Sequence, residues 1–319
     1  MSGAIQRENL AGLIPEPVTR EIFQSVVEQS SVLRYGRRLP NMTSKTQSIN
    51  VLDMLPMAYW VDGDTGYKET SHMEWEKKKL YAEELAVIIP IPEAVLEDSN
   101  YDIWGEVRPR VVEAMGRRID EAILFGIGRP NTWRYGIVKT AKDAGNVVTE
   151  TAGGDLYQEL LGEGGLIAKA EESGYTPTMI MSAIQMRAKL RGLTDTTKRP
   201  IFMSNMQGNA QYMLDGIPMH FPMNGAWDAE TALMIAGDFN QLVYSIRQDA
   251  TYKILTEATI VEPASKQIVY SLAQQDMVAL RVVMRLGWEI PNPTSAYRNT
   301  LDNYCPFAVF VPAEEETNH

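Results

Sequence analysis

Apolar residues recur at helical spacing over one long stretch in the first half of the chain. Ser99 and Asn100 offer side-chain oxygens for an N-cap, and one face after them carries an apolar residue at every fourth position. These residues are Ile103, Val107, Val111, Met115, Ile119 and Ile123. The pattern predicts a helix over about residues 100–126, with a bend or one weakened hydrogen bond at Pro109 and an end at Gly126.

Two stretches on the N-terminal side of this helix alternate apolar and polar residues at the period of a strand. They carry Ile49 and Val51 and, later, Leu85, Val87 and Ile89. The turn sequence Asp62-Gly63-Asp64-Thr65-Gly66 lies between them, so the pattern predicts one long hairpin over residues 46–89.

A hairpin of two strands is only marginally stable in water, and the sequence supplies no obvious third strand beside this one. We expect a neighbouring subunit to support it, with exposed aromatic side chains as interface anchors. The alternative is that these side chains pack within their own chain. The candidates are Tyr59, Trp60, Tyr67 and Trp75, with Lys68 beside them at the tip.

The N-terminal stretch mixes charges of both signs and is predicted to form an arm that carries one helix. Pro15 and Pro17 suit a first helical turn, and an apolar stripe at helical spacing follows them. Arg34, Arg37 and Arg38 near its end are candidate contacts with another subunit. A helix docked on the chain's own core is the alternative.

Short helices and strands alternate from about residue 146 and predict a compact α/β domain. The first predicted helix covers residues 155–172, a short strand covers 178–181, and Ser182 caps a helix that runs to Leu190. Further strands are predicted at residues 233–235, 242–244 and 252–256.

A strictly alternating pattern follows this domain. Apolar residues occupy every second position from Val278 to Ile290, while Arg281, Arg285 and Glu289 lie on the other face. The pattern predicts a long, half-buried strand that would outreach a small sheet.

The composition of the chain excludes several classes of function. With 319 residues and 45% hydrophobic content, it can bury a large core and is expected to form about two domains. No apolar run approaches the roughly 18 residues that span a bilayer, and no secretory signal is evident, so we expect a cytoplasmic protein without a membrane partner. The net charge of -11 argues against tight nucleic-acid binding, which uses clustered Lys and Arg, but suits the wall of a container for DNA.

Residues that could carry catalysis or bind a metal are scattered along the sequence. His72, His220 and His319 have no metal-ligand spacing, and Cys305 has no CxxC partner. We expect His220 in the core or in a sheet with its hydrogen bonds satisfied, and Cys305 as a small apolar residue. The glycine pairs lack the spacing of a dinucleotide or phosphate loop. We therefore predict no catalytic residue, no metal site and no cofactor.

Several local sequences, taken in order, resemble one known family. They are Trp60-Val61, Leu96-Glu97-Asp98-Ser99, Ile119-Asp120-Glu121-Ala122-Ile123-Leu124-Phe125-Gly126, Tyr135-Gly136-Ile137, Gly237-Asp238-Phe239 and Met284-Arg285-Leu286. The elements also follow in a characteristic order of arm, long hairpin, long helix, α/β domain and long return strand. Motifs and order together cover nearly the whole chain, and they resemble the major capsid proteins of tailed bacteriophages.

The resemblance implies an α+β fold in four parts. These are an N-terminal arm (1–40), an extended hairpin loop (41–89), a peripheral domain with a spine helix (90–145 and 262–292), and an axial domain (146–261 and 293–319). The loop would reach over a neighbouring subunit, and the axial domain would line the capsomer centre. The implied function is that of a major head protein, which assembles as pentamers and hexamers into an icosahedral shell around double-stranded DNA.

The resemblance also implies partners beyond further copies of the chain. They are a portal protein, decoration proteins on some shells, and packaged DNA in weak, non-specific contact. Some relatives begin with a scaffolding segment that is later removed, whereas this chain reaches its arm almost at once, so we expect a separate scaffolding protein or none. Some relatives join a loop lysine to a neighbour's asparagine by an isopeptide bond. Lys68 with Asn292 or Asn299 would be the candidates here, and we predict that this bond is absent.

Two other functions stay open from the sequence. An encapsulin, which resembles the same fold, would enclose a cargo enzyme instead of a genome. A soluble α/β enzyme would hold its active site in residues 146–261. Shell size and contents distinguish the first alternative, and a stable, active monomer would favour the second.

Overall fold

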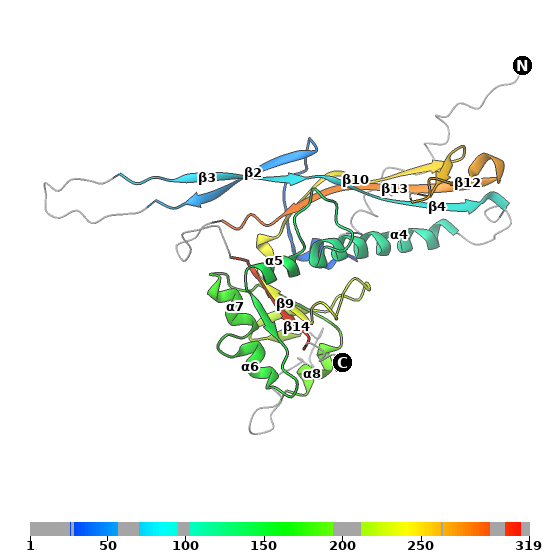
Figure 1. Cartoon of the computed structure of the whole chain (residues 1–319). Coiled ribbons are helices and arrows are strands. Elements are labelled where there is room, and N and C mark those ends of the chain that lie inside the picture. Colours follow the sequence, from blue (N-terminus) through cyan, green and yellow to red (C-terminus); the bar gives the residue numbers. More distant parts are fainter. Residues whose placement is uncertain are drawn as a thin grey trace, which may run out of the picture.

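The computed structural model describes residues 26, 29–56, 70–94, 103–193, 212–262, 264–293 and 304–313. Long strands and one long helix form an elongated part, and a body of short helices and strands lies beneath one end of it (Figure 1). A two-stranded hairpin projects beyond that same end. Helices and strands are therefore mixed, as an α+β fold requires.

The elongated part is a sheet whose described strands follow the order β1-β10-β13-β4. They are β1 (Arg37–Arg38), β4 (Glu83–Pro92), β10 (Val243–Leu255) and β13 (Met277–Glu289). β1 runs parallel to β10, and the other neighbouring pairs are antiparallel. β13 confirms the predicted long strand, with Leu280 and Val282 buried and Arg281 exposed. The prediction that only one face is buried is wrong, because Ala279 and Val283 on the face of Arg281 are buried as well.

The long helix α4 (Ile103–Asp120) covers one face of this sheet (Figure 1). Its Val111, Met115 and Ile119 belong to the same apolar core as the buried face of β13. The helix continues as the π-helical segment η3 (Glu121–Phe125) and ends at Gly126, whose φ is 77°. The predicted end is thus confirmed, and the predicted caps Ser99 and Asn100 lie outside the described residues.

The hairpin is shorter than predicted. β2 (Thr46–Met54) pairs antiparallel with β3 (Glu74–Tyr81). After Ala82 the chain pairs with β13 as strand β4, so the prediction of one hairpin over residues 46–89 is wrong for 83–89. The backbone stays extended across Ala82 and only changes its partner, which leaves the alternation of apolar residues unbroken. The predicted tip, residues 62–66, lies outside the described residues.

Strand β10 was predicted as two separate strands of the α/β domain. The number of strands and the sheet to which they belong are both wrong. Residues 243–255 form one strand that pairs with β13 in the long sheet. Register shifts between Ile246 and Gln248, and again between Gln248 and Thr251, interrupt its alternation. These irregularities hid the continuity of the strand in the sequence.

The body contains a second sheet, with its described strands in the order β5-β14-β9-β6-β8-β7. The strands are β5 (Val147–Thr149), β6 (Met179–Ser182), β7 (Met213–Leu214), β8 (Ile217–His220), β9 (Met234–Gly237) and β14 (Phe307–Val311). The helices are α5 (Ile137–Asp143), α6 (Leu156–Leu161), α7 (Leu166–Glu172) and α8 (Met186–Arg191), with the 3-10 turn η4 (Phe239–Gln241). Phe307 and Val309 pack in the core shared with α4, whereas Ala308 and Phe310 pack against α6–α8. The alternate faces of β14 thus join the body to the long sheet.

Two predictions within the body are wrong in detail. The helix predicted over 155–172 is two helices, α6 and α7, because Gly162–Gly165 intervene and Gly164 has a φ of 74°. Ser182 ends strand β6, and its hydroxyl donates to the Ala183 carbonyl oxygen instead of capping α8, which begins at Met186. The strand predicted over 178–181 and the one over 233–235 are confirmed as β6 and β9, each shifted by a residue or two.

Candidate functional site

The hairpin β2–β3 presents an exposed face. Trp75, Lys77 and Lys79 alternate along β3 and point to this face, and the Trp75 side chain is 59% exposed. Trp75 is one of the predicted interface anchors, and it lies where a second molecule can reach it. The other predicted anchors of the hairpin, Tyr59, Trp60, Tyr67 and Lys68, lie outside the described residues.

The root of the hairpin is fixed by charged and apolar contacts. Leu80 is fully buried, and Lys78, two residues earlier on the same face, is half-buried. Burial lowers the pKa of the Lys78 ammonium, although the carboxylates of Glu76 and Glu289 act in the opposite direction. Glu289 also forms a 2.6 Å ion pair with Arg134. The root is therefore held against the end of β13, while the rest of the hairpin projects away.

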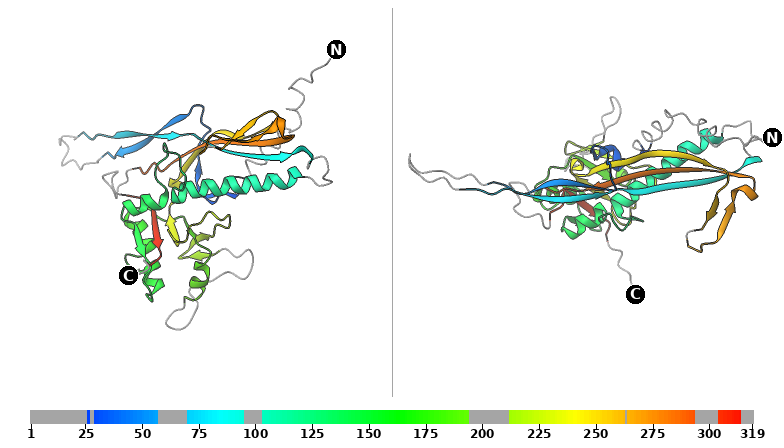
Figure 2. Two further views of the ribbon diagram at one scale, coloured as in Figure 1. Left: turned by 45° about the vertical axis from the view of Figure 1, so that its right-hand side comes forward. Right: turned by 90° about the horizontal axis from the view of Figure 1, so that it is seen from above.

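A second, smaller hairpin lies at the opposite end of the long sheet (Figure 2). It consists of β11 (Thr259–Val261) and β12 (Ile268–Ser271), followed by the turn η5 (Leu272–Gln274). Its exposed apolar side chains are Val261, Ile268, Val269 and Tyr270, with Ile268 66% exposed. This surface was not predicted from the sequence, although the β-branched runs on both sides of residues 262–267 indicate two short strands.

The three predicted arginines lie together near the N-terminal edge of the long sheet. Arg34 ends helix α2 (Ser31–Tyr35), and its guanidinium lies 5.4 Å from the centre of the Tyr35 ring. Arg37 and Arg38 form β1, and Arg38 donates a 3.0 Å hydrogen bond to the Asn41 side chain. All three side chains are exposed, which suits contacts with another molecule.

Asp120 joins the N-terminal segment to the end of α4. Its buried carboxylate accepts hydrogen bonds from the Ser30 hydroxyl at 2.6 Å and from the backbone amides of Ser31 and Val32 at 2.9 and 3.1 Å. The Asn224 side chain donates a further bond of 2.7 Å to the same carboxylate. Burial raises the pKa of the Asp120 carboxyl, and these four hydrogen bonds oppose that shift. This role of Asp120 was not predicted from the sequence.

His220 lies at the end of β8 beside the same segment, as the prediction of a satisfied sheet histidine required. Its Nε2 is 2.9 Å from the Ser31 hydroxyl, and its Nδ1 is 3.3 Å from the Tyr35 hydroxyl. Burial, followed by the nearby Arg34 charge, lowers the pKa of His220 to about 4. The ring is therefore neutral at pH 7 and packs in a hydrogen-bonded junction.

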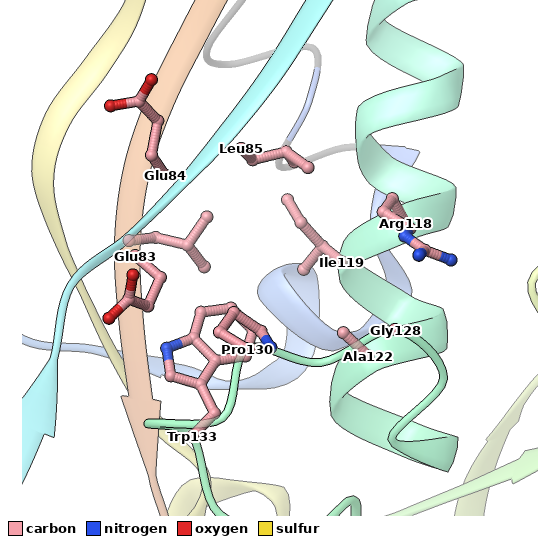
Figure 3. Close-up of a pocket in the computed structure, with 10 residues that line it drawn as sticks. Glu83, Glu84, Leu85, Arg118, Ile119, Ala122, Gly128, Pro130 and Trp133 are labelled. Carbon is pink, nitrogen blue, oxygen red and sulfur yellow. The ribbon is translucent and has the colours of Figure 1, made fainter. Parts of the chain in front are cut away.

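A small pocket of about 90 Å³ lies between β4 and the end of α4 (Figure 3). Leu85, Ile119 and Trp133 face one another across it, whereas Glu84 and Arg118 point away. Glu84 accepts hydrogen bonds from Arg285, and Arg118 donates one to Glu121. The pocket is thus mostly apolar, and its charged neighbours are already paired.

Metal-binding and nucleophilic groups are sparse in the described residues. No group of three or more metal-ligating side chains occurs in this part of the chain. His72 is exposed, and His319 lies outside the described residues. Cys305 is fully buried, as predicted, and burial raises the pKa of its thiol to about 11. No helix among the described residues is long and apolar enough to cross a membrane.

Comparison with known proteins decides which family this arrangement represents. The model of the phage capsid family matches residues 11–297. The chain belongs to the phage capsid family. The major capsid protein of Staphylococcus phage 80alpha is 27% identical to it over 316 residues, which are 98% of this chain and 89% of the relative.

Solved structures agree with this membership of the phage capsid family. A chain of Microbacterium phage Oxtober96 superposes with a TM-score of 0.76 at 35% identity, covering 89% of this chain and 91% of that one. A chain of Mycobacterium phage Adephagia gives a TM-score of 0.74 at 30% identity, covering 97% and 98%. These matches support the prediction that the chain is a major capsid protein, which is a structural part of the virion. They do not favour the alternative prediction of an encapsulin shell.

Proposed function

We propose that copies of this capsid protein assemble as pentamers and hexamers into a closed icosahedral shell around double-stranded phage DNA. The observation that carries this proposal is the hairpin β2–β3, which projects from the body with Trp75 exposed. A hairpin of two strands has little stability by itself in water. Another copy of the chain supplies the surface on which it rests.

The hairpin β11–β12 forms a second contact between copies. Its clustered exposed apolar side chains, above all Ile268, are of the kind that marks an interaction surface. The occupant is a second copy of this chain, because a shell built from one protein presents the same surfaces many times. Contacts at both ends of the long sheet link each copy to more than one neighbour.

The four parts implied by the resemblance take corrected boundaries in this proposal. The extended loop is the segment 46–81, which contains the strands β2 and β3. The peripheral domain is the long sheet with α4, and it includes residues 83–92 and 243–255. The axial domain is the body with the second sheet. The exposed Arg34, Arg37 and Arg38 belong to the arm and contact another copy.

Partners outside the shell follow from charge and from the family. A net charge of -11 supports weak, non-specific contact with the packaged DNA, which moves freely during filling. A portal protein, a separate scaffolding protein and, on some shells, decoration proteins complete the particle, which assembles in the host cytoplasm. The protein carries no catalytic residue, metal or cofactor in this account.

Expression of the chain alone, followed by size-exclusion chromatography and negative-stain electron microscopy, tests the proposal. Closed shells or ring-shaped capsomers are the expected products, and the particle diameter separates a phage head from a smaller compartment. A protein that stays monomeric, even when a scaffolding protein is co-expressed, contradicts the proposal.

A further inference from the structure

The root of the hairpin is a joint at which one extended chain changes its partner. β3 pairs with β2 up to Tyr81, and β4 pairs with β13 from Glu83, which lies opposite Leu286. Ala82 lies between the two strands, and its amide donates a 2.8 Å hydrogen bond to the Lys45 carbonyl oxygen. The direction of the whole hairpin is therefore set by how the backbone passes Ala82.

Gly287 of β13 is the residue over which this backbone passes. A Cβ atom at Gly287 would lie 2.6 Å from the carbonyl oxygen of Tyr81 and 3.0 Å from its carbonyl carbon. Real Cβ atoms do not approach backbone atoms that closely, and a backbone carbonyl cannot swing aside as a flexible side chain can. Gly287 is thus required for the present path of the chain.

Trp133 contacts the same carbonyl group through its side chain. Its indole N–H donates a 3.0 Å hydrogen bond to the Tyr81 carbonyl oxygen, and the Trp133 side chain is buried. The residues on both sides of Trp133 make further contacts with β4 and β13. Thr132 donates a 2.7 Å hydrogen bond to Glu83, and Arg134 pairs with Glu289. One short loop thus ties β4 and β13 together at the joint.

We propose that Trp133 and Gly287 are positioning residues that fix the direction in which the hairpin β2–β3 leaves the body, and hence the angle at which copies meet. This inference rests on the proposed function. The eight residues of β3, at about 3.3 Å each, make a lever of roughly 26 Å. A tilt of about 10° at the joint would move its far end by roughly 5 Å, which is enough to break the register of a packed interface.

A matched pair of tryptophans provides the test. Trp288 packs edge-to-face on Trp133 with ring centres 6.3 Å apart and is also buried, but its indole N–H has no hydrogen-bond partner among the described residues. Trp133→Phe and Trp288→Phe therefore remove the same atoms from neighbouring rings, and only the first removes a hydrogen bond. Gly287→Ala perturbs the joint independently.

Hydrogen exchange on unassembled subunits and electron microscopy of assembled particles give the two readouts. In Trp133→Phe we expect the Ala82 amide to exchange roughly tenfold faster, because the Tyr81 carbonyl loses its buried partner. The particles of this variant and of Gly287→Ala should be misassembled or broadly distributed in diameter. Trp288→Phe should match the wild type in both readouts.

Unchanged exchange in Trp133→Phe would overturn the proposal, and so would faster exchange with particles of wild-type diameter. Neither result touches the proposed function as long as the wild type forms shells. If the wild type forms none, the proposed function fails, and with it the part of this inference that concerns assembly. If Trp133→Phe does not fold, Gly287→Ala decides alone by its particle diameters.

Discussion

The carboxylate of Asp120 accepts a 2.6 Å hydrogen bond from the hydroxyl of Ser30, a residue 90 positions earlier in the chain. Ser30 is also the N-cap of α2, so Asp120 and Ser30 together satisfy the free amides at the start of that helix. Asn224 adds a contact from the loop after β8. One buried carboxylate thus joins two separate segments to the end of α4.

Replacement of Asp120 should strongly destabilise the subunit. In Asp120→Asn the side chain keeps one good acceptor and turns an NH₂ group toward donors, so buried N–H groups lose their partners. We expect a loss of about 2 to 4 kcal/mol in the free energy of unfolding, measured by urea denaturation of unassembled subunits. Asp143→Asn is the control, because its pair with Lys139 is exposed and contributes about 0.5 kcal/mol or less. Equal stability of the two variants would contradict the role of Asp120.

The subunit should lose stability in mild acid, because its folded state keeps the His220 ring neutral. Its folded-state pKa of about 4 is below the usual 6.5, so between these values the unfolded chain binds a proton that the folded chain does not. The stabilisation is fully present above pH 6.5 and is lost as the pH falls toward 4. We therefore expect His220→Gln to lose less stability than the wild type over this window.

Urea denaturation at a series of pH values measures this difference. The ionisation of Asp120 also affects stability near the acid end, but both proteins carry that residue, so its effect cancels in the comparison. His72→Gln, at an exposed site, should reproduce the wild-type profile. Parallel profiles for the wild type and His220→Gln would show that the histidine is not held neutral by the fold.

Loss of an aromatic anchor on the hairpin should impair assembly more than folding. Trp75 is 59% exposed, so Trp75→Ala should change the free energy of unfolding by no more than about 0.5 kcal/mol. We expect the yield of particles to fall at least tenfold by sedimentation, while Trp75→Phe keeps most of it. Trp60→Ala should act in the same direction. Normal particle yields from both alanine variants would remove these residues from the interface.

A charge on the second hairpin should have a similar effect. Ile268→Asp places a carboxylate in the apolar surface of β11–β12, where burial against another copy would leave it unpaired. We expect assembly to stop at smaller oligomers in size-exclusion chromatography, while circular dichroism of the subunit stays unchanged. Gln267→Asp adds the same charge at the neighbouring polar position and should still assemble. Equal behaviour of the two variants would exclude Ile268 as a contact.

Mature particles should contain no covalent bonds between subunits. Asn292 is buried, accepts a hydrogen bond from the Tyr175 hydroxyl and donates one of 2.9 Å to the Tyr304 carbonyl oxygen, so its amide is engaged within its own chain. Denaturing gel electrophoresis of intact particles should show a monomer band. A ladder of covalent oligomers would contradict this expectation, and mass spectrometry of the ladder would then test Lys68 with Asn292 or Asn299.

The sequence was most informative where one element keeps one partner along its whole length. Helix α4 and strand β13 follow a single period over many residues. The end of the helix and both ends of the strand were predicted to within a residue or two. The prediction failed at Ala82, where an extended chain changes partner, and along β10, where register shifts break the alternation. Periodicity reports which face of an element is buried but carries no information about which strand lies beside it.

The residues proposed to contact another copy were chosen by the same reasoning. Trp75 and the three arginines were predicted as contacts from residue type and position, and all four are exposed. The role of Asp120 could not be predicted from its motif, because it depends on Ser30 and Asn224, which are distant in sequence. The roles of Trp133 and Gly287 could not be predicted for the same reason, since both depend on the Tyr81 carbonyl group, which is distant in sequence and close in space.

A cryo-electron microscopy reconstruction of the assembled particle at side-chain resolution tests the proposed assembly most directly. We predict a closed icosahedral shell in which Trp75 of one copy is buried against another copy and Ile268 is covered at a second contact. A shell in which both hairpins remain open to solvent, or touch only their own chain, would contradict it.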